Sequence, residues 1–290
     1  MRCLSFLLTI FAIVACASSA HAAMETFART TIEWKLLPNG PSSQTVRSDL
    51  QTNGSPAFSE QVETYGTART EAKFGYLKIY GESIREPVFD SIGGRAARGL
   101  AWYVDEFTIN GGVGIGTASI GVIVTGVRQS TADLGFGSNA GGYNIEVSLD
   151  PDGVNTPVID SSNPKSSREF QGTGLSVMDI ADGTSGEFQF TYGVPFELKV
   201  LLSAYAAVDP VGLDGIPSNE LQSHSILNLG NTATTYIELP QGASIAAASG
   251  TQYLLGPLPI PIPPALLMFL PASLFALLPV SRRKIPPPAT

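Results

Sequence analysis

Apolar and polar residues alternate with a period of two along most of the middle of the chain. In YNIEVSL, residues 143–149, Tyr, Ile, Val and Leu alternate with Asn, Glu and Ser, which is the pattern of a strand with one buried face. TIEWKLL, residues 31–37, follows the same pattern, and no stretch shows a clear 3.6-residue apolar period over three turns. The sequence therefore predicts an all-β protein. Further strands are predicted in KFGYLKIY, AWYVDEFTI, ASIGVIVTGV, GEFQFTY, PFELKVLLSAY and TTYIEL.

Asn-Gly and Asp-Gly dipeptides punctuate the chain at intervals that suit strand, turn, strand. They favour the positive backbone angles of tight reversals, so we expect hairpins and Greek keys in an antiparallel, jelly-roll-like β-sandwich. NGGVGIGTAS, residues 110–119, is expected to be a hairpin, because it lacks the G-x-G-x-x-G order of a nucleotide-binding loop. Residues 37–61 and 150–174 are polar and are expected to be surface loops. The dipeptides are Asn39-Gly40, Asn53-Gly54, Asn110-Gly111, Asp152-Gly153, Asp182-Gly183 and Asp214-Gly215.

The amino-terminal segment has the features of a secretory signal peptide. The basic Arg2 precedes an apolar run, and the small-x-small sequence AHA closes the segment at residue 22. The alternative is a lipoprotein signal in which Cys16 is acylated. In both cases the protein is exported. We therefore expect a signal peptide at residues 1–22 and a β-sandwich domain at residues 23–255.

The body between the two terminal segments is strongly acidic. Residues 1–22 and 256–290 hold four of the 17 Lys and Arg residues and no Asp or Glu, which leaves 13 bases against 25 acids and a net charge of −12. Such a surface disfavours nucleic acid and anionic lipid as partners. Both cysteines, Cys3 and Cys16, fall in the first segment, so the body is expected to hold together by core burial without an internal disulfide.

Few side chains of the body suit catalysis. His224 is the one histidine beyond residue 22, and its setting in LQSHSILNL is typical of a solvated or hydrogen-bonded strand histidine. Asp105, Glu106 and Glu187 have apolar neighbours, and they leave open a polysaccharide hydrolase that uses paired carboxylates about 5–9 Å apart. We expect these acids to be strand residues beside core aromatics, and the protein not to be an enzyme.

The body offers residues for two kinds of ligand contact. Exposed aromatic side chains would indicate a carbohydrate-binding module, because sugars stack on flat rings. The candidates for such a sugar platform are Trp34, Trp102 and Tyr103. The turn LDPDGVN offers oxygen ligands of the kind that calcium prefers, from Asp150, Asp152 and Asn155. It lacks the spacing and the terminal Glu of an EF-hand loop, so an ordinary turn without a metal is expected, with calcium as the alternative.

The chain ends on a layout that suits a sorting signal. Residues 265–280 are apolar and would form a helix of about 24 Å, which is shorter than a bilayer core of about 30 Å and is interrupted by prolines. Arg282, Arg283 and Lys284 follow, and the positive-inside rule would keep them in the cytoplasm. We therefore expect residues 256–290 to hold a short motif, a temporary transmembrane helix and a basic stop.

This tail resembles the PEP-CTERM sorting signals of exported proteins in Gram-negative bacteria that make exopolysaccharide, in their V-P-L-P-A-type variant. The matching stretch is IPIPPALLMF, with Pro261, Pro263, Pro264 and Ala265 as the motif, although LPAS replaces the glycine pair that usually follows. The resemblance implies an exosortase as partner, transient anchoring in the inner membrane, and delivery to the cell surface or the extracellular matrix. It implies no activity for the body, for which we expect a non-catalytic structural or adhesive role in the exopolysaccharide of the biofilm matrix. A carbohydrate-binding module and a carboxylate-based hydrolase are the alternatives.

Overall fold

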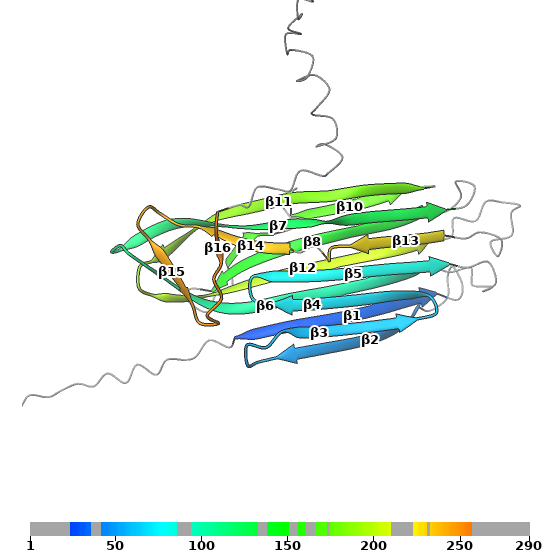
Figure 1. The fold of residues 1–290 in the computed structure, drawn as a ribbon, viewed down its shortest axis with the longest axis horizontal. Coiled ribbons are helices and arrows are strands. Elements are labelled where there is room, and N and C mark those ends of the chain that lie inside the picture. Colours follow the sequence, from blue (N-terminus) through cyan, green and yellow to red (C-terminus); the bar gives the residue numbers. More distant parts are fainter. Residues whose placement is uncertain are drawn as a thin grey trace, which may run out of the picture.

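The described part of the chain is built from strands and contains no helix, so the prediction of an all-β protein is confirmed. The computed structural model describes residues 24–35, 42–85, 94–132, 138–150, 156–160, 166–172, 175–209, 223–230 and 233–256. Figure 1 shows most of the strands running along the long axis of the molecule. The predicted signal peptide at residues 1–22 lies outside the described residues, and so does the predicted sorting signal except for Gly256.

The first sheet, sheet A, contains six main strands that are all antiparallel to their neighbours. Their order is β10 (Ser167–Gly172), β8 (Ser138–Asp150), β12 (Pro195–Asp209), β6 (Arg95–Asn110), β1 (Glu25–Lys35) and β2 (Ser42–Gln51). Two short strands extend it, because β9 (Thr156–Ile159) pairs with β8 and β15 (Ser244–Ala247) pairs with the end of β6.

The second sheet, sheet B, is antiparallel except for one short pairing. Its order is β16 (Leu254–Leu255), β14 (Ala233–Glu238), β7 (Ile115–Ala132), β13 (Ser223–Asn228), β5 (Tyr76–Arg85), β4 (Gly66–Lys73) and β3 (Ala57–Glu63). The long strand β11 (Ser176–Thr191) pairs with β7, and only β14 and β16 run parallel. Both β13 and β14 pair with β7 and with β5, so they lie end to end between these two strands.

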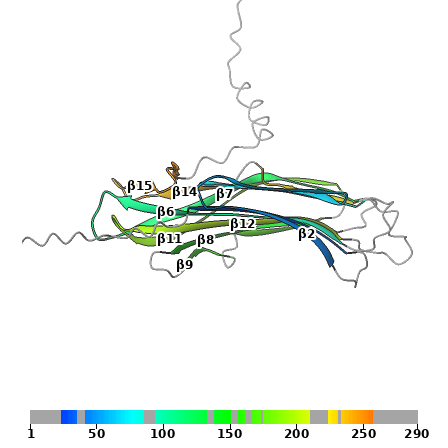
Figure 2. The ribbon, with the colours of Figure 1, turned by 90° about the horizontal axis from the view of Figure 1, so that it is seen from below.

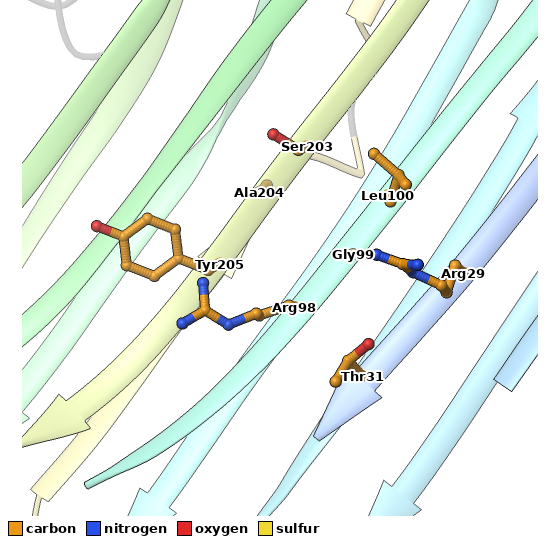
Figure 3. A pocket seen from close by; sticks show the side chains of 8 residues that line it. All are labelled: Arg29, Thr31, Arg98, Gly99, Leu100, Ser203, Ala204 and Tyr205. Atoms are coloured by element: carbon orange, nitrogen blue, oxygen red, sulfur yellow. The ribbon is translucent and has the colours of Figure 1, made fainter. Parts of the chain in front are cut away.

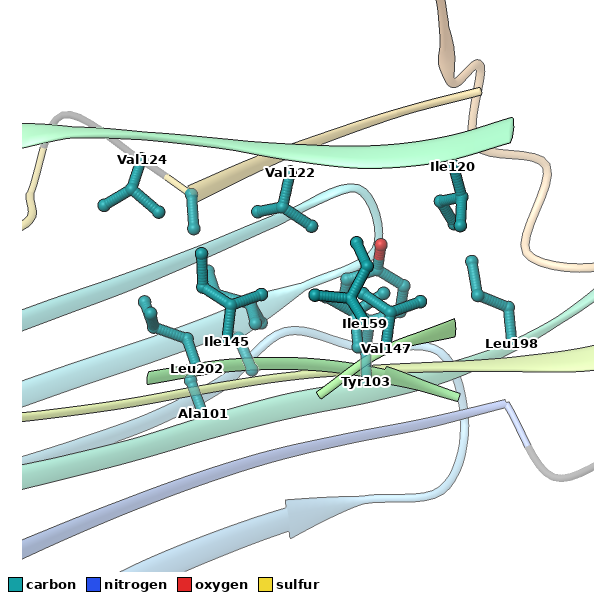
Figure 4. Close-up of a cluster of buried hydrophobic side chains, with 14 of the residues drawn as sticks. Ala101, Tyr103, Ile120, Val122, Val124, Ile145, Val147, Ile159, Leu198 and Leu202 are labelled. Atoms are coloured by element: carbon teal, nitrogen blue, oxygen red, sulfur yellow. The ribbon is translucent and has the colours of Figure 1, made fainter. Parts of the chain in front are cut away.

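The two sheets lie face to face and form a β-sandwich, which Figure 2 shows as two layers. Apolar side chains from both sheets meet between the layers; Figure 4 shows Val122 and Val124 of sheet B above Ile145 of sheet A. Tyr103 is completely buried there, and its hydroxyl donates to Oγ1 of Thr235 at 2.7 Å, which joins β6 to β14. Burial of this ring requires such a partner for its hydroxyl.

The predicted alternation of YNIEVSL is confirmed by the burial of β8. Tyr143, Ile145, Val147 and Leu149 are buried, whereas Asn144 and Glu146 lie on the outer face. In β7, residues 120–124 are buried on both faces, and the ring of Tyr236 covers the outer side of Gly121. A Cβ atom at Gly121 would lie 2.2 Å from that ring, so the close approach of the ring requires glycine.

Two stretches that the sequence predicted as loops contain strands. Residues 37–61 hold β2 and the start of β3, and residues 150–174 hold β9 and β10. The prediction failed for β2 because this edge strand buries neither face, and even its apolar residues Val46 and Leu50 are half exposed. A strand without a buried face lacks the alternation on which the prediction depended.

The turn predictions are confirmed at two dipeptides and wrong at a third. Gly54 and Gly111 have φ angles of 80° and 100°, as reversals at Asn-Gly require. In contrast, β11 runs through Asp182 and Gly183 without a reversal, paired with β7 over its whole length. The glycine-rich residues 110–119 connect β6 in sheet A to β7 in sheet B, so they are not the expected hairpin. The dipeptides Asn39-Gly40, Asp152-Gly153 and Asp214-Gly215 lie outside the described residues.

Candidate functional site

The outer face of sheet A carries side chains that alternate with the buried residues of the same strands. In β1, the buried Ala28 and Thr30 alternate with Phe27, Arg29 and Thr31, which point away from the core. The strand register then sets each outward residue directly beside an outward residue of the next strand. Residues that are far apart in the sequence therefore form straight rows across the sheet.

One of these rows is apolar across four neighbouring strands. We call it the apolar ladder; it consists of Leu50, Phe27, Trp102 and Leu201, on β2, β1, β6 and β12. The rings of Phe27 and Trp102 are stacked, with centroids 5.4 Å apart and planes inclined by 19°. Leu50 is 51% exposed. The ammonium group of Lys199 lies 5.2 Å from the centre of the Trp102 ring, within the range of a cation–π interaction.

Two further rows enclose a small hollow beside the apolar ladder. We call it the arginine hollow; its lining includes Arg29, Leu100 and Ser203 from one row, and Thr31, Arg98 and Tyr205 from the next. Figure 3 shows the two guanidinium groups on the neighbouring strands β1 and β6, with the ring of Tyr205 beside Arg98. The volume of about 160 Å³ is below the roughly 300–1,000 Å³ of pockets for drug-sized ligands, so the hollow would hold a chemical group of a larger molecule.

The charges of the arginine hollow are only partly compensated. Nε of Arg98 lies 3.3 Å from Oε2 of Glu33, and its guanidinium carbon lies 5.4 Å from the centre of the Tyr205 ring. Arg29 is exposed and forms no ion pair with any other described residue. Burial raises the pKa of Tyr205, the charge of Glu169 raises it further, and Arg98 lowers it. One positive charge therefore remains available for an anionic group.

The three residues of the predicted sugar platform lie in different places. Trp102 points outward in the apolar ladder. Tyr103 points into the core, where it is 0% exposed, so it does not belong to a surface platform. Trp34 also points to the inner side, where it packs against the buried cluster of Ile32, Ala68 and Ala97. The centroid of its ring lies 6.1 Å from that of Tyr65. Neighbouring positions on a strand face opposite sides, which separates Trp102 from Tyr103.

The candidate carboxylates of a hydrolase do not converge on one cleft. Asp105 is completely buried; its carboxylate accepts hydrogen bonds from the hydroxyl groups of Ser249 at 2.5 Å and Tyr253 at 2.9 Å. Burial raises its pKa, although these hydrogen bonds act in the opposite direction. Asp105 thus ties the segment after β15 to the core. Glu106 lies on the outer face of sheet A, and the exposed Glu187 lies in sheet B.

His224 is a strand residue on the outer face of sheet B, where its Nε2 atom lies 2.7 Å from Oε1 of Glu82. The interpretation as a hydrogen-bonded strand histidine is confirmed. Asp150 is the last residue of β8, while its predicted calcium partners Asp152 and Asn155 lie outside the described residues. Within the described ranges, no three His, Cys, Asp or Glu side chains gather as a metal site would require.

The residues proposed for sorting lie outside the described part of the chain. They are Cys16, the motif Pro261, Pro263, Pro264 and Ala265, and the basic stop Arg282, Arg283 and Lys284. Between residues 24 and 256, the described segments contain no helix with the length and apolarity of a membrane span.

Most residues of this face were not predicted from the sequence. Phe27, Arg29 and Thr31 alternate with buried residues in TFARTTIE, and this alternation could have indicated that they share an outer face. Their proximity to Trp102 and Arg98 depends on the pairing of β1 with β6, whose residues are about 70 positions apart. That pairing is visible only in the structure.

Comparisons with known proteins leave the family open, since no family model and no curated protein matches this chain.

Proposed function

We propose that this chain is an exported, non-catalytic protein of the exopolysaccharide matrix, and that it holds polysaccharide on the outer face of sheet A. The observation that carries the proposal is the apolar ladder, with its stacked Phe27 and Trp102 rings facing away from the core. A contiguous, partly exposed apolar row on the outer face of a sheet is typical of a contact surface. Rigid neighbouring strands hold its side chains in fixed positions before the ligand arrives.

The dimensions of the apolar ladder suit a chain of sugars. Four strands at a spacing of about 4.8 Å extend over about 14 Å, which exceeds the width of a single sugar ring. The C–H face of a pyranose ring is apolar and stacks on flat aromatic rings, while its hydroxyl groups at the rim need polar partners. Lys199 beside Trp102 and the hydroxyl groups of Thr31 and Ser203 in the neighbouring rows would provide these partners.

The proposed location follows from the two ends of the sequence. The signal peptide would export the chain, and the PEP-CTERM-like tail would anchor it transiently in the inner membrane. An exosortase would then cut near Pro261 to Ala265 and release the body to the cell surface or the matrix. We also propose a jelly-roll-like topology, because the chain changes sheets at each step from β5 to β8 and again through β11, β12 and β13.

Polysaccharide binding is tested with ring truncations on opposite faces. The Trp102→Ala variant should bind roughly 30-fold more weakly in affinity electrophoresis against a panel of soluble exopolysaccharides, because truncating a central aromatic contact costs about 2 kcal/mol. The Trp102→Phe variant should recover most of the binding, since it restores a flat ring. Phe58→Ala removes a 52% exposed ring from sheet B and is the matched control, which should bind like the wild type.

Two results would contradict the proposal. If Phe58→Ala weakened binding as much as Trp102→Ala does, the contact would not be specific to sheet A. If the wild type bound no polysaccharide of the panel, including that of its own host, the adhesive role would be refuted. Circular dichroism melts of each variant show whether a loss of binding reflects unfolding.

The sorting step is tested separately in the native host. Mass spectrometry of each cell fraction should find a form that lacks the segment after about residue 261 in the surface or matrix fraction only when the exosortase is present. If the full-length chain remained in the membrane fraction in both strains, the tail would be a permanent anchor and the proposed sorting would be wrong.

A further inference from the structure

Two guanidinium groups lie together on the surface of an acidic protein. Residues 23–255 carry 25 acids against 13 bases, yet Arg29 and Arg98 line the same hollow. Glu33 compensates Arg98 at 3.3 Å, which leaves the charge of Arg29 without an ion-pair partner among the described residues. An uncompensated guanidinium on a face that otherwise suits sugars points to an anionic group on the ligand.

The spacing of the rows links the arginine hollow to the apolar ladder. Arg29 follows Phe27 by two positions on β1, and Leu100 precedes Trp102 by two positions on β6, which corresponds to about 7 Å along each strand. A sugar stacked on the Trp102 ring would therefore bring its own substituent, or that of the next sugar, to the hollow. The hollow has room for one such group.

The polar lining of the arginine hollow matches a carboxylate more closely than a neutral hydroxyl group. A guanidinium presents parallel N–H donors that bind both oxygens of a carboxylate. The guanidinium of Arg29 forms no ion pair with a described Asp or Glu. The hydroxyl groups of Thr31 and Ser203 lie in the same lining and would bind the neighbouring sugar hydroxyl groups.

We propose that the ligand of this face is an acidic polysaccharide, whose uronic acid units stack on the apolar ladder and place a carboxylate in the arginine hollow against Arg29. This inference rests on the proposed function, because it names the class of polysaccharide that the face selects. Arg29 determines the preference for acidic sugars, while Trp102 provides binding common to acidic and neutral sugars.

The test compares the same polymers with and without their carboxylates. Affinity electrophoresis is run with polygalacturonate and alginate, with carboxyl-reduced neutral samples of both, and with dextran sulfate. The wild type should bind the native polyuronates roughly three- to tenfold more tightly than the reduced polymers, which is the range expected for a partly exposed charged contact. The difference should shrink when salt is added.

Variants assign the preference to one residue. Arg29→Gln should remove the difference between native and reduced polymers and leave binding of the reduced polymers within about twofold of the wild type. Lys73→Gln, which removes an exposed cation from β4 in sheet B, is the matched control and should keep the preference. Trp102→Ala should weaken binding of native and reduced polymers alike.

Failure of this inference is distinguishable from failure of the proposed function. Equal binding of native and reduced polymers, or tighter binding of dextran sulfate than of either polyuronate, would overturn the preference for uronates and leave Trp102-dependent binding intact. Absence of binding to both native polyuronates would also overturn it, and the panel of exopolysaccharides with Trp102→Ala then decides the proposed function separately. An unchanged preference in Arg29→Gln would exclude the arginine hollow as its source.

Discussion

Charged and polar side chains pair with one another on the outer face of sheet B. On the outer face of sheet A, the rings of Phe27 and Trp102 stack on each other, and the guanidinium group of Arg29 forms no ion pair with a described residue. On sheet B, Arg69 pairs with Glu60 at 2.6 Å, and the hydroxyl of Tyr80 donates to Glu82 at 2.9 Å. Glu82 also contacts His224 at 2.7 Å, so paired polar groups extend across β3, β4, β5 and β13.

The difference shows which face has bonding capacity left for a ligand. A ligand on sheet B would have to replace contacts that already exist, such as the hydrogen bond from the hydroxyl of Tyr76 to Glu71 at 2.9 Å. On sheet A, a ligand would compensate Arg29 without breaking an ion pair of that residue, and on the apolar ladder it would share the Trp102 ring with the ammonium group of Lys199. We therefore expect changes on sheet B to affect stability, and changes on sheet A to affect binding.

The largest effect on stability is expected from a substitution in the core between the two sheets. A Cβ atom at Gly99, directly beneath the arginine hollow, would lie 2.4 Å from Cγ2 of Ile79 and 2.8 Å from Oγ1 of Thr70. Gly99→Ala should therefore lower the free energy of unfolding by about 1–3 kcal/mol and the melting temperature by roughly 3–10 °C. Thermal melts followed by circular dichroism measure this change.

The matched control is Gly183→Ala on β11, where the nearest atom to a new Cβ, Cγ1 of Ile123, is 4.0 Å away. This variant should melt within about 2 °C of the wild type, because nothing is displaced. Equal losses in both variants would mean that glycine is needed at these positions for a reason other than the packing of the sheets.

A second effect concerns the tyrosines of sheet B at high pH. Burial raises the pKa of Tyr80 to about 12, and the hydrogen bond to Glu82 adds to this shift. The folded state therefore keeps its proton where the unfolded chain, with a pKa of 10.0, loses it. Stability from this group is complete below pH 10 and should be lost between about pH 10 and 12.

The difference in tyrosinate absorbance between wild type and Tyr80→Phe isolates this titration from those of the other tyrosines. The difference should develop near pH 12 in the folded protein and near pH 10 in denaturant. Ionisation near pH 10 in the folded protein as well would show that Tyr80 is solvated and that its hydrogen bond to Glu82 does not persist.

The fold class was predictable because several strands alternate visibly. The alternation of Ile145 and Val147 with Asn144 and Glu146 follows directly from the period of a strand that buries one face. The edge strand β2 was missed because no face of it is buried. The reversal predicted at Asp182 was wrong because the pairing of β11 with β7 outweighs the local turn preference of Asp182-Gly183. Local signals fail where long-range pairing determines the structure.

The candidate site was predictable only in part, for a related reason. The sequence indicated Trp102 as a sugar contact, but it also indicated Tyr103, which the period of the strand turns into the core. The arginine hollow unites residues of β1, β6 and β12, and no sequence spacing indicates that Arg29 lies near Tyr205. Sites made across strands depend on register, which a single sequence does not reveal.

A third effect separates stability from binding on sheet B. Glu82→Ala removes the acceptor for the hydroxyl of Tyr80 and the partner of His224. We expect a loss of about 1 kcal/mol, or roughly 2–4 °C in melting temperature, with unchanged polysaccharide binding. Glu187→Ala, an exposed carboxylate on β11, is the control and should change neither quantity. Weaker polysaccharide binding by Glu82→Ala at full stability would break the distinction between the two faces.

The smallest effect is expected for the most exposed ion pair of sheet B. Arg69 and Glu60 lie 2.6 Å apart, but their side chains are 57% and 38% exposed, so water and salt screen their attraction. Arg69→Gln should therefore lower the free energy of unfolding by at most about 0.5 kcal/mol, and urea titration in high salt should reduce even this difference. A loss well above about 1 kcal/mol that persisted in salt would mean that the paired groups from β3 to β13 act as one cooperative network. Sheet B would then be a stabilising unit in its own right. The expected absence of polysaccharide binding on sheet B would follow from that cooperativity more than from its individual charge pairs.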